Sequence, residues 1–349
     1  MDSIKRPVYI LLSLAVFLSI EGCKLKKDKL LNVTETSLSA KQYTIDEREL
    51  MHYPFRVRLK DSSVYIMDLH GAEAFIQTFS FPALKWQKSI GQPGNGPHEM
   101  LDCENIRFDS AKRLWLMDAN KMNLSIHSND TLIEVALDRD LVRPLDFCLL
   151  NDSLIIVPDY TGRHRFVYVD SKGTIVSEIG QIPDNKTKKK RTNMALAQAW
   201  RSFIDYNPTN GILALATQLG EVVEIWDSKK NIRLGVFIGQ EGIPVFKDRN
   251  GAAIPDGIMG YSDVQVGSNY VYALFWGHTF KDLKKGLITK EGGKRLDVFN
   301  LQGKRIHVIH LDRNVAGFEI NEVSGMMLAL DPNSNQPLVS YTLPRKVLP

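Results

Sequence analysis

The chain repeats one sequence pattern six times, and this repeat constrains its fold more than any other feature. In each copy, turn-forming residues precede a short hydrophobic run, and a second β-rich run follows. The six hydrophobic runs begin at Val64, Leu114, Leu154, Ile212, Tyr270 and Met326. Their spacings are 50, 40, 58, 58 and 56 residues, and propeller blades take about 40–50 residues each, with the excess in loops. The repeat therefore predicts an all-β, six-bladed β-propeller.

The turns around each run predict that a blade is a four-stranded antiparallel meander. Asp, Asn, Ser and Gly precede the run, for example at Asp61–Ser63 and Asn207–Gly211, and such residues close hairpins. A third and a fourth strand follow, as at Val222–Asp227 and Ile232–Ile238. Asn193–Trp200 interrupts this order, and we expect it to form a short helix or a loop.

The sixth unit is one strand short. After Leu338–Leu343 the chain reaches Pro349, which leaves no room for a fourth strand. The segment Leu38–Ile45, ahead of the first unit, is β-capable and has no other assignment. An open ring would leave two exposed sheet edges, which promote aggregation. We therefore expect this N-terminal strand to complete the last blade and to close the ring.

The N-terminus has the features of a bacterial export signal. Lys5 and Arg6 precede the apolar run Pro7–Ile20, and its 14 residues suit a signal-peptide core but are too few to span a bilayer. The run leads to Cys23, in a position that resembles a lipobox, where a thiol receives a diacylglyceryl group and the leader is cut before it. Glu21 departs from the small residue usual there. The alternative is a cleaved soluble leader followed by an incidental cysteine.

The chain is therefore expected to consist of three parts. Residues 1–22 are the expected lipoprotein signal peptide, residues 23–37 a polar, lysine-rich tether, and residues 38–349 the propeller. We expect a lipid-anchored protein of the outer membrane, because acyl chains on Cys23 would hold it there. The tether lacks an acidic run associated with surface display, which favours the periplasmic face.

Charge and cysteine content exclude some functions and leave others open. The 44 basic and 40 acidic residues give a net charge of +4, without the concentrated basic face typical of nucleic-acid binders. Besides Cys23 the chain has Cys103 and Cys148. An exported compartment permits a disulfide between these two, but their positions near innermost strands favour two small buried side chains.

One glycine-rich stretch carries a family resemblance. The sequence from Ile90 to Met100, IGQPGNGPHEM, resembles the Gly-x-Gly-Pro-x-Glu signature of TolB-like six-bladed propellers, a family abundant as lipoproteins in Bacteroidota. His98 stands where many members have a small residue, and the full signature appears once. The resemblance implies a six-bladed propeller on a membrane anchor and implies no particular activity. A phosphate-binding loop needs a helix after the glycines, whereas Ile106–Phe108 is β-like, so we expect a turn between blades.

Known catalytic and metal-binding motifs are absent from the sequence. It contains no H-E-x-x-H and no G-x-S-x-G. His307 and His310 are three apart on an expected strand and so face opposite sides. Asp331–Asn335 begins like a calcium loop but lacks its glycine and its bidentate acid, and it is typical of a turn. The basic run Lys186–Arg191 fits a solvated loop, although contact with anionic lipid or polysaccharide is the alternative.

Propeller geometry indicates where a ligand would bind. Residues just before the first strand of each blade collect at one mouth of the central channel. These candidates are His52, Tyr53, Glu104, Arg143, Trp200, Arg201 and Tyr261. Aromatic rings beside arginines suit a sugar or a carboxylate-bearing ligand. The competing interpretation is that Arg143 and Arg201 pair with acids that fill the channel.

Together these features favour a non-catalytic, monomeric binding module, tethered to the membrane, for a protein or a glycan of the cell envelope. We expect no cofactor, no metal site and no nucleic-acid partner. The alternative is a metal-assisted, lactonase-like hydrolase at the channel mouth, for which Glu104, Asn105 and Asp146 are loosely placed. That alternative rests on fold analogy, which is a weak argument for function.

Overall fold

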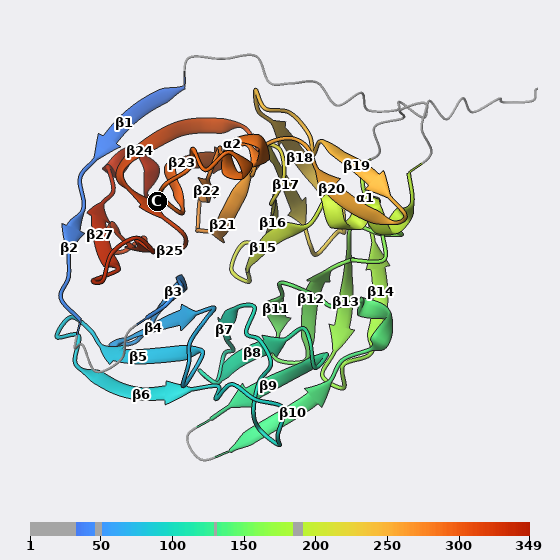
Figure 1. The fold of residues 1–349 in the computed structure, drawn as a ribbon, viewed down its shortest axis with the longest axis horizontal. Coiled ribbons are helices and arrows are strands. Elements are labelled where there is room, and N and C mark those ends of the chain that lie inside the picture. The colour runs from blue at the N-terminus through green and yellow to red at the C-terminus, as the bar shows by residue number, and fades with distance from the viewer. Residues whose placement is uncertain (1–32, 46–50, 129–130, 184–190) are drawn as a thin grey trace, which may run out of the picture.

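The computed structural model describes residues 33–45, 51–128, 131–183 and 191–349. Six of the sheets in this part of the chain are arranged as blades around a central axis (Figure 1). The signal peptide 1–22, Cys23, most of the expected tether and nearly all of the basic run 186–191 lie outside the described residues. The predicted all-β, six-bladed architecture is confirmed.

Each blade has four antiparallel strands, and the first strand of each lies nearest the axis (Figure 1). The first blade comprises β3 (Pro54–Lys60), β4 (Ser63–Asp68), β5 (Ile76–Ser80) and β6 (Trp86–Ile90). The second comprises β7 (Ile106–Phe108), β8 (Leu114–Asp118), β9 (Asn123–His127) and β10 (Leu132–Ala136). The third comprises β11 (Cys148–Asn151), β12 (Leu154–Pro158), β13 (Phe166–Asp170) and β14 (Ile175–Ile179).

The other three blades carry the additional elements. The fourth comprises β15 (Ser202–Asn207), β16 (Ile212–Thr217), β17 (Val222–Asp227) and β18 (Ile232–Ile238). The fifth comprises β21 (Tyr261–Val266), β22 (Tyr270–Phe275), β23 (Gly293–Asn300) and β24 (Arg305–Val315). The sixth comprises β25 (Phe318–Asn321), β26 (Met326–Leu330), β27 (Leu338–Thr342) and β2 (Lys41–Gln42). Between and within the blades lie η1 (Arg139–Leu141), α1 (Asn193–Ala199), the hairpin β19 (Phe246–Arg249) and β20 (Ala252–Pro255), α2 (Phe280–Lys284) and η2 (Arg345–Val347).

The six hydrophobic runs are the second strands of the six blades, as their preceding turns predict. They are almost fully buried because both faces of a second strand pack against neighbouring blades. A separate apolar cluster fills the space between each pair of adjacent blades, including the sixth and the first, where Leu328 and Leu330 pack with Val57 and Ile66. The core is therefore continuous around the ring.

The N-terminal segment closes the ring, and it does so with two strands. Strand β2 pairs antiparallel with β27 and completes the sixth blade, as predicted. Strand β1 (Thr34–Leu38) was not foreseen: it pairs in parallel with β24 along the outer edge of the fifth blade. His307 and His310 hold it, because their Nε2 atoms lie 2.9 Å from Thr36 Oγ1 and from Glu35 Oε2. Strand β1 therefore lies inside the segment 23–37, which the sequence analysis assigned to the tether.

The Asp that closes several of the runs has a structural role. Asp68 accepts hydrogen bonds from the backbone N–H groups of His52, Tyr53 and His70, at 2.6, 2.7 and 3.0 Å. Asp118 accepts from Leu101 at 2.6 Å and from Lys121 at 2.7 Å. These carboxylates satisfy backbone groups that no strand pairs, and they hold the segment before the first strand of the same blade and the turn after the run.

The glycine-rich signature forms the expected turn between the first and second blades. Glu99 Oε2 accepts a hydrogen bond from the N–H of Gly96 at 2.6 Å. A Cβ at position 94 would lie 2.1 Å from that carboxylate, so a larger residue there would displace Glu99 from this contact. Asp331–Asn335 is also a turn, and Cys103 and Cys148 are both buried and free.

Candidate binding sites at the two mouths of the channel

The blades meet the axis in a group of charged side chains that we call the charged belt. It consists of Arg56, Arg58, Arg107, Asp146, Asp205, Asp263 and Glu319, which come from, or directly precede, the first strands. Most are buried: Arg56 is 0% exposed and Asp146 is 1% exposed. Buried charges are tolerated when they are paired and hydrogen-bonded.

The charged belt links every pair of neighbouring blades. Its carboxylates accept backbone N–H groups of the next first strand, and its arginines donate to side chains or carbonyls of adjacent blades. The contacts around the ring are Arg58–Asn105 (3.3 Å), Asn105–Asp146 (2.6 Å), Asp146–Ile204 N (2.8 Å), Asp205–Val266 N (2.7 Å), Asp263–Phe318 N (3.1 Å) and Arg58–Phe318 O (3.2 Å). The belt is thus a polar counterpart of the apolar clusters between blades.

Arg107 makes the tightest contacts of the belt. Its Nη1 lies 2.5 Å from Asp205 Oδ1, its Nη2 lies 3.6 Å from Asp146, and its Nε donates to the carbonyl of Phe147 at 2.8 Å. Burial disfavours the charged guanidinium, but Asp205 and Asp146 outweigh it and hold the pKa of Arg107 above its ordinary value. Asn105 and Asp146, the residues considered for a hydrolase site, are therefore occupied in joining blades.

An aromatic pair fills the middle of the channel. Phe55 of the first blade and Phe203 of the fourth lie on opposite sides of the ring, and their ring centroids are 6.2 Å apart. The guanidinium of Arg56 sits over both rings, 4.1 Å and 4.5 Å from their centroids. These contacts separate two mouths. The turn-side mouth lies at the hairpins between first and second strands, and the loop-side mouth lies where the chain enters each blade.

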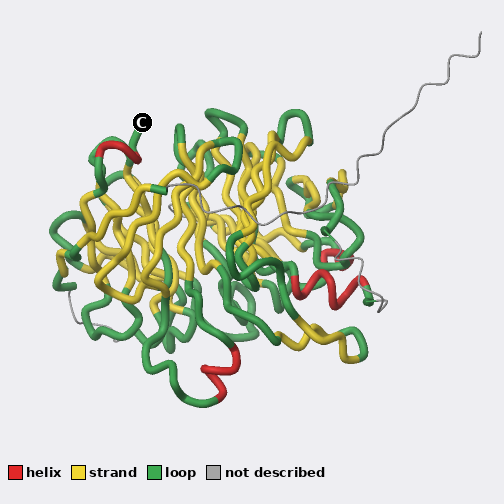
Figure 2. Tube along the Cα trace, turned by 90° about the horizontal axis from the view of Figure 1, so that it is seen from above, coloured by secondary structure: helices red, strands yellow, loops and turns green. Residues whose placement is uncertain are grey.

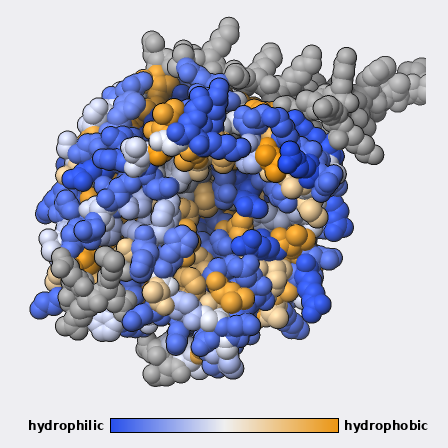
Figure 3. All heavy atoms as spheres, viewed as in Figure 1, coloured by the Kyte–Doolittle hydropathy of each residue, from blue (hydrophilic) through white to orange (hydrophobic). Residues whose placement is uncertain are grey.

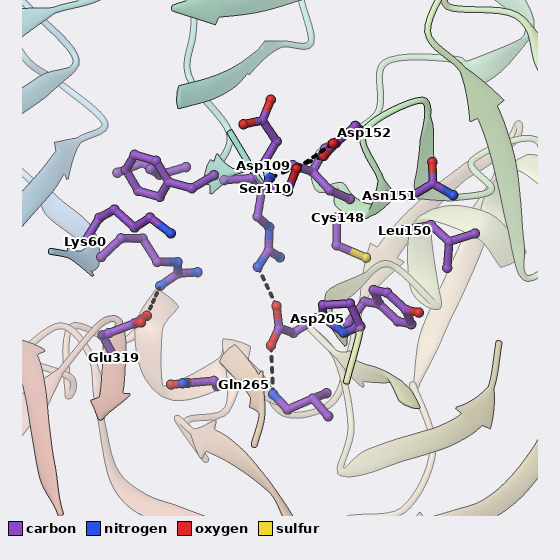
Figure 4. Close-up of a pocket in the computed structure, with 18 of the residues that line it drawn as sticks. Lys60, Asp109, Ser110, Cys148, Leu150, Asn151, Asp152, Asp205, Gln265 and Glu319 are labelled. Atoms are coloured by element: carbon purple, nitrogen blue, oxygen red, sulfur yellow. Dashed lines mark hydrogen bonds and ion pairs between the residues drawn. The ribbon is translucent and has the colours of Figure 1, made fainter. Parts of the chain in front are cut away.

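The turn-side mouth contains a cavity of about 600 Å³ (Figure 4). Its walls combine apolar side chains with charged ones from the first strands and their turns. Among the residues that line it are Lys60, Arg107, Phe108, Leu149, Leu150, Asp205, Tyr206 and Glu319. In Figure 4, Asp205 and Glu319 point toward arginines of the charged belt, which form the floor of the cavity.

Two charged groups of this cavity are free to respond to a ligand. Lys60 makes no ion pair with any residue that the structure describes, and its Nζ lies 5.9 Å from the centroid of the Phe108 ring. Glu319 lies 3.8 Å from Arg58. Burial raises the pKa of Glu319 to about 7, with Asp205 and Asp263 adding to the rise and Arg58 opposing it. Besides the paired charges of its walls, the cavity therefore contains one cation without an ion pair among the described residues and one acid whose pKa is raised.

The loop-side mouth is where the sequence places its candidates, and three of them meet there. Glu104 lies within electrostatic range of Arg143 and Arg201. Burial and Asp102 raise the pKa of Glu104 to about 8, while the two arginines oppose the rise. Arg143 is exposed and lies 3.9 Å from Asp102, and Arg201 lies 5.9 Å from the ring centroid of Tyr160.

The other four candidates have structural surroundings. Trp200 is 2% exposed and packs with α1, so it belongs to the core and presents no face to a ligand. Tyr261 is also 2% exposed, and its hydroxyl donates to Asp297 at 3.0 Å. His52 is exposed and is held through its backbone by Asp68. The hydroxyl of Tyr53 donates to Glu291 at 3.2 Å.

The loop-side mouth also contains a smaller cavity, of about 190 Å³, and of the seven predicted residues Tyr261 alone is among those that line it. It is lined by Phe55, Phe203, Gln218, Leu219, Met259, Gly260, Tyr261, Ser262, Trp276 and Phe280. A signal for it does exist in the repeat. The runs of the fourth and fifth units lack the closing Asp, and Gln218 and Trp276 follow them instead.

Metal-binding clusters and membrane-spanning helices were both sought among the described residues. Within the described residues, no group of three or more His, Cys, Asp or Glu side chains is arranged to hold a metal ion. In the same part of the chain, no helix has the length and apolarity needed to cross a bilayer. On the face drawn in Figure 3, hydrophilic residues dominate the rim and the centre is hollowed.

The ring of six four-stranded blades with an internally blocked channel defines a six-bladed β-propeller with a cavity at each mouth. The chain belongs to the TolB-like 6-blade propeller-like family, whose model matches residues 32–323. This confirms the resemblance seen in the glycine-rich signature. No curated protein matches the sequence significantly.

Solved structures show the same fold at low sequence identity. A putative exported protein from Bacteroides fragilis is 13% identical with a TM-score of 0.55, over 84% of this chain and 83% of that one. A member of the DUF4221 family from Bacteroides vulgatus is 12% identical with a TM-score of 0.55, over 87% and 97%. The RRP9 WD40 repeats are 9% identical with a TM-score of 0.52, over 87% and 100%. At these identities the likeness shows the fold alone.

Proposed function

We propose that this protein is a membrane-anchored bacterial lipoprotein whose propeller is a non-catalytic binding module for a protein or glycan of the envelope. The observation that carries the proposal is the turn-side cavity of about 600 Å³, set in a rigid ring. A cavity of this size with apolar walls and a few fixed polar groups is typical of ligand sites. The blocked channel argues for recognition at a mouth rather than passage through the ring.

The chemistry of this cavity favours a protein segment over a glycan. Phe108, Leu149 and Leu150 offer apolar contact, while Lys60 and Glu319 offer charges of both signs. A peptide carries apolar and charged side chains on one backbone and can satisfy all of these at once. Below them, Arg107 and Asp205 of the charged belt pair with each other, so a ligand need not supply partners for these two.

Ligand binding at the turn-side cavity is tested by reversing the charge of Lys60. Lys60→Glu should lower the affinity for the envelope partner more than tenfold, because it replaces the cation of the cavity by an anion. The partner is captured by crosslinking to the immobilised full-length protein and identified by mass spectrometry. The matched control is Lys112→Glu, an exposed lysine on the same face that does not line the cavity and pairs with Asp61 at 3.0 Å. Equal capture by both variants would argue against this site.

The proposed lipid anchor at Cys23 is tested separately. Cys23→Ser removes the thiol that a diacylglyceryl group requires. The variant should lose incorporation of labelled palmitate and move from the membrane fraction to the soluble fraction. Unchanged labelling would show that the anchor is elsewhere or absent, without bearing on ligand binding.

A further inference from the structure

The small cavity at the loop-side mouth is built by the least regular parts of the propeller. Residues 239–260, which connect the fourth blade to the fifth, contain the β19–β20 hairpin, and residues 276–292, inside the fifth blade, contain α2. In the side view of Figure 2, α1, α2 and the hairpin all project from the same side of the ring. Elaborated loops on a rigid scaffold are where binding sites concentrate.

These two connections are tied to each other by backbone hydrogen bonds. Met259 N donates to the carbonyl of His278 at 2.7 Å, Gly277 N to Met259 at 3.1 Å and Trp276 N to Gly260 at 2.8 Å. Gly260 also lies close against the fourth blade, because a Cβ there would lie 2.3 Å from the carbonyl oxygen of Gly220. The walls of the cavity are therefore fixed before any ligand arrives, which reduces the entropic cost of binding.

Two side chains that line the cavity carry hydrogen-bonding atoms that the protein leaves unused. Among the described residues, Trp276 Nε1 and Ser262 Oγ are buried atoms without a hydrogen-bond partner. Ser262 is 6% exposed and sits at a β-bulge between Tyr261 and Asp263, and bulges redirect side chains next to functional sites. An unsatisfied buried polar group destabilises the protein, so a ligand that satisfies it recovers this free energy.

The lining defines the chemical class of that ligand. Aromatic rings of Phe55, Phe203, Trp276 and Phe280 form its apolar surface, and no charged side chain is among the residues that line it. Trp276 Nε1 is a donor, while the Ser262 hydroxyl and the Gln218 amide both donate and accept. A neutral sugar ring has C–H faces that pack on aromatic rings and hydroxyl edges that donate and accept hydrogen bonds.

We propose that the loop-side cavity binds one neutral pyranose ring, such as the terminal residue of a glycan. The volume of about 190 Å³ is below the usual range for drug-sized ligands and suits a single ring. This site is separate from the turn-side cavity, and it involves none of the three charged residues, Glu104, Arg143 and Arg201, that the sequence placed at this mouth.

Saturation-transfer NMR on the purified full-length protein tests the site, because it detects millimolar binding to a large particle. The probes are glucose, galactose, mannose and N-acetylglucosamine, with glucuronate as the charged comparison. We expect at least one neutral sugar to bind, and Trp276→Leu to weaken it more than tenfold. Ser262→Ala should weaken it about three- to tenfold, and it keeps the test informative if Trp276→Leu misfolds, since the hydroxyl that it removes has no partner in the described structure.

Two control variants locate the effect. Trp86→Leu makes the same change on the outer strand β6 and should leave sugar binding unchanged. Lys60→Glu should also leave it unchanged, so failure of the turn-side proposal and failure of this one are distinguishable. The proposal is overturned if none of the neutral sugars binds at tens of millimolar, if glucuronate binds and they do not, or if binding survives both cavity variants.

Discussion

The two mouths of the channel are built in different ways. At the turn-side mouth, short hairpin turns repeat around the ring, and the polar groups beneath the cavity belong to the charged belt, where Arg107 and Asp205 satisfy each other. At the loop-side mouth, longer connections carry α1, α2 and the β19–β20 hairpin, and polar atoms of Trp276 and Ser262 remain unsatisfied. The comparison separates groups that stabilise the fold from groups that are available to a ligand.

The largest expected effect tests what the two mouths share, which is a closed ring. A truncated protein of residues 46–349 lacks β1, β2 and the buried Ile45, and it is compared with a protein of residues 33–349. The free energy of unfolding should fall by at least about 5 kcal/mol, since a strand pairing and a buried side chain are lost at the closing seam. Urea unfolding measures it. A fall below about 1 kcal/mol would mean that the ring closes without this segment.

The second prediction tests the difference between the mouths directly. Arg107→Ala removes one partner of a buried ion pair and should cost about 3–5 kcal/mol of unfolding free energy. Trp276→Leu keeps apolar contact at the other mouth and should cost less than about 1 kcal/mol. Arg107→Lys keeps the charge but loses the planar set of guanidinium donors. Its cost in unfolding free energy should lie between those of Arg107→Ala and Trp276→Leu. Equal costs at the two mouths would contradict the comparison.

The smallest expected effect concerns protonation at the loop-side mouth. The pKa of Glu104 is raised from 4.5 to about 8 in the folded state. Between these values the folded protein keeps a proton that the unfolded chain releases, so this group makes stability fall as pH rises and has no further effect above about pH 8. Glu104→Gln removes this pH dependence of the stability. Between pH 4.5 and pH 8, the free energy of unfolding of the variant should rise by about 2 kcal/mol relative to the wild type.

Urea unfolding at intervals from pH 4 to pH 9 measures this gain. The control Glu73→Gln changes an exposed carboxylate of the first blade and should follow the wild-type profile. If the unfolding free energies of Glu104→Gln and wild type change with pH in parallel, the pKa of Glu104 is not raised in the folded state.

The blades were predictable because each second strand carries a local signal. A run such as Leu114–Asp118 is apolar, short and preceded by a turn, and its burial on both faces follows from its sequence. Strand β1 was not predictable, since Thr34–Leu38 is polar and half-exposed and pairs with a strand about 270 residues away. Side chains of His307 and His310 contact this strand. From the sequence, the spacing of these two histidines was considered only as a possible metal site, which the strand geometry argued against.

The sites were less predictable than the blades for a related reason. The channel mouths are assembled from side chains on six strands that lie tens of residues apart, and which of them point inward depends on register. Propeller geometry brought Glu104, Arg143 and Arg201 to one mouth. It did not show that Trp200 is drawn into the core by α1, or that Phe55 and Phe203 meet across the ring.

The parallel pairing of β1 with β24 has a mechanical consequence. A pull on the N-terminal segment acts along β1, perpendicular to its hydrogen bonds with β24, so those bonds bear the load together in shear rather than breaking one by one. The same segment continues directly into β2, which completes the sixth blade. Any tension between the propeller and whatever holds its N-terminus is therefore taken up first by the fifth blade, before it reaches the seam that closes the ring.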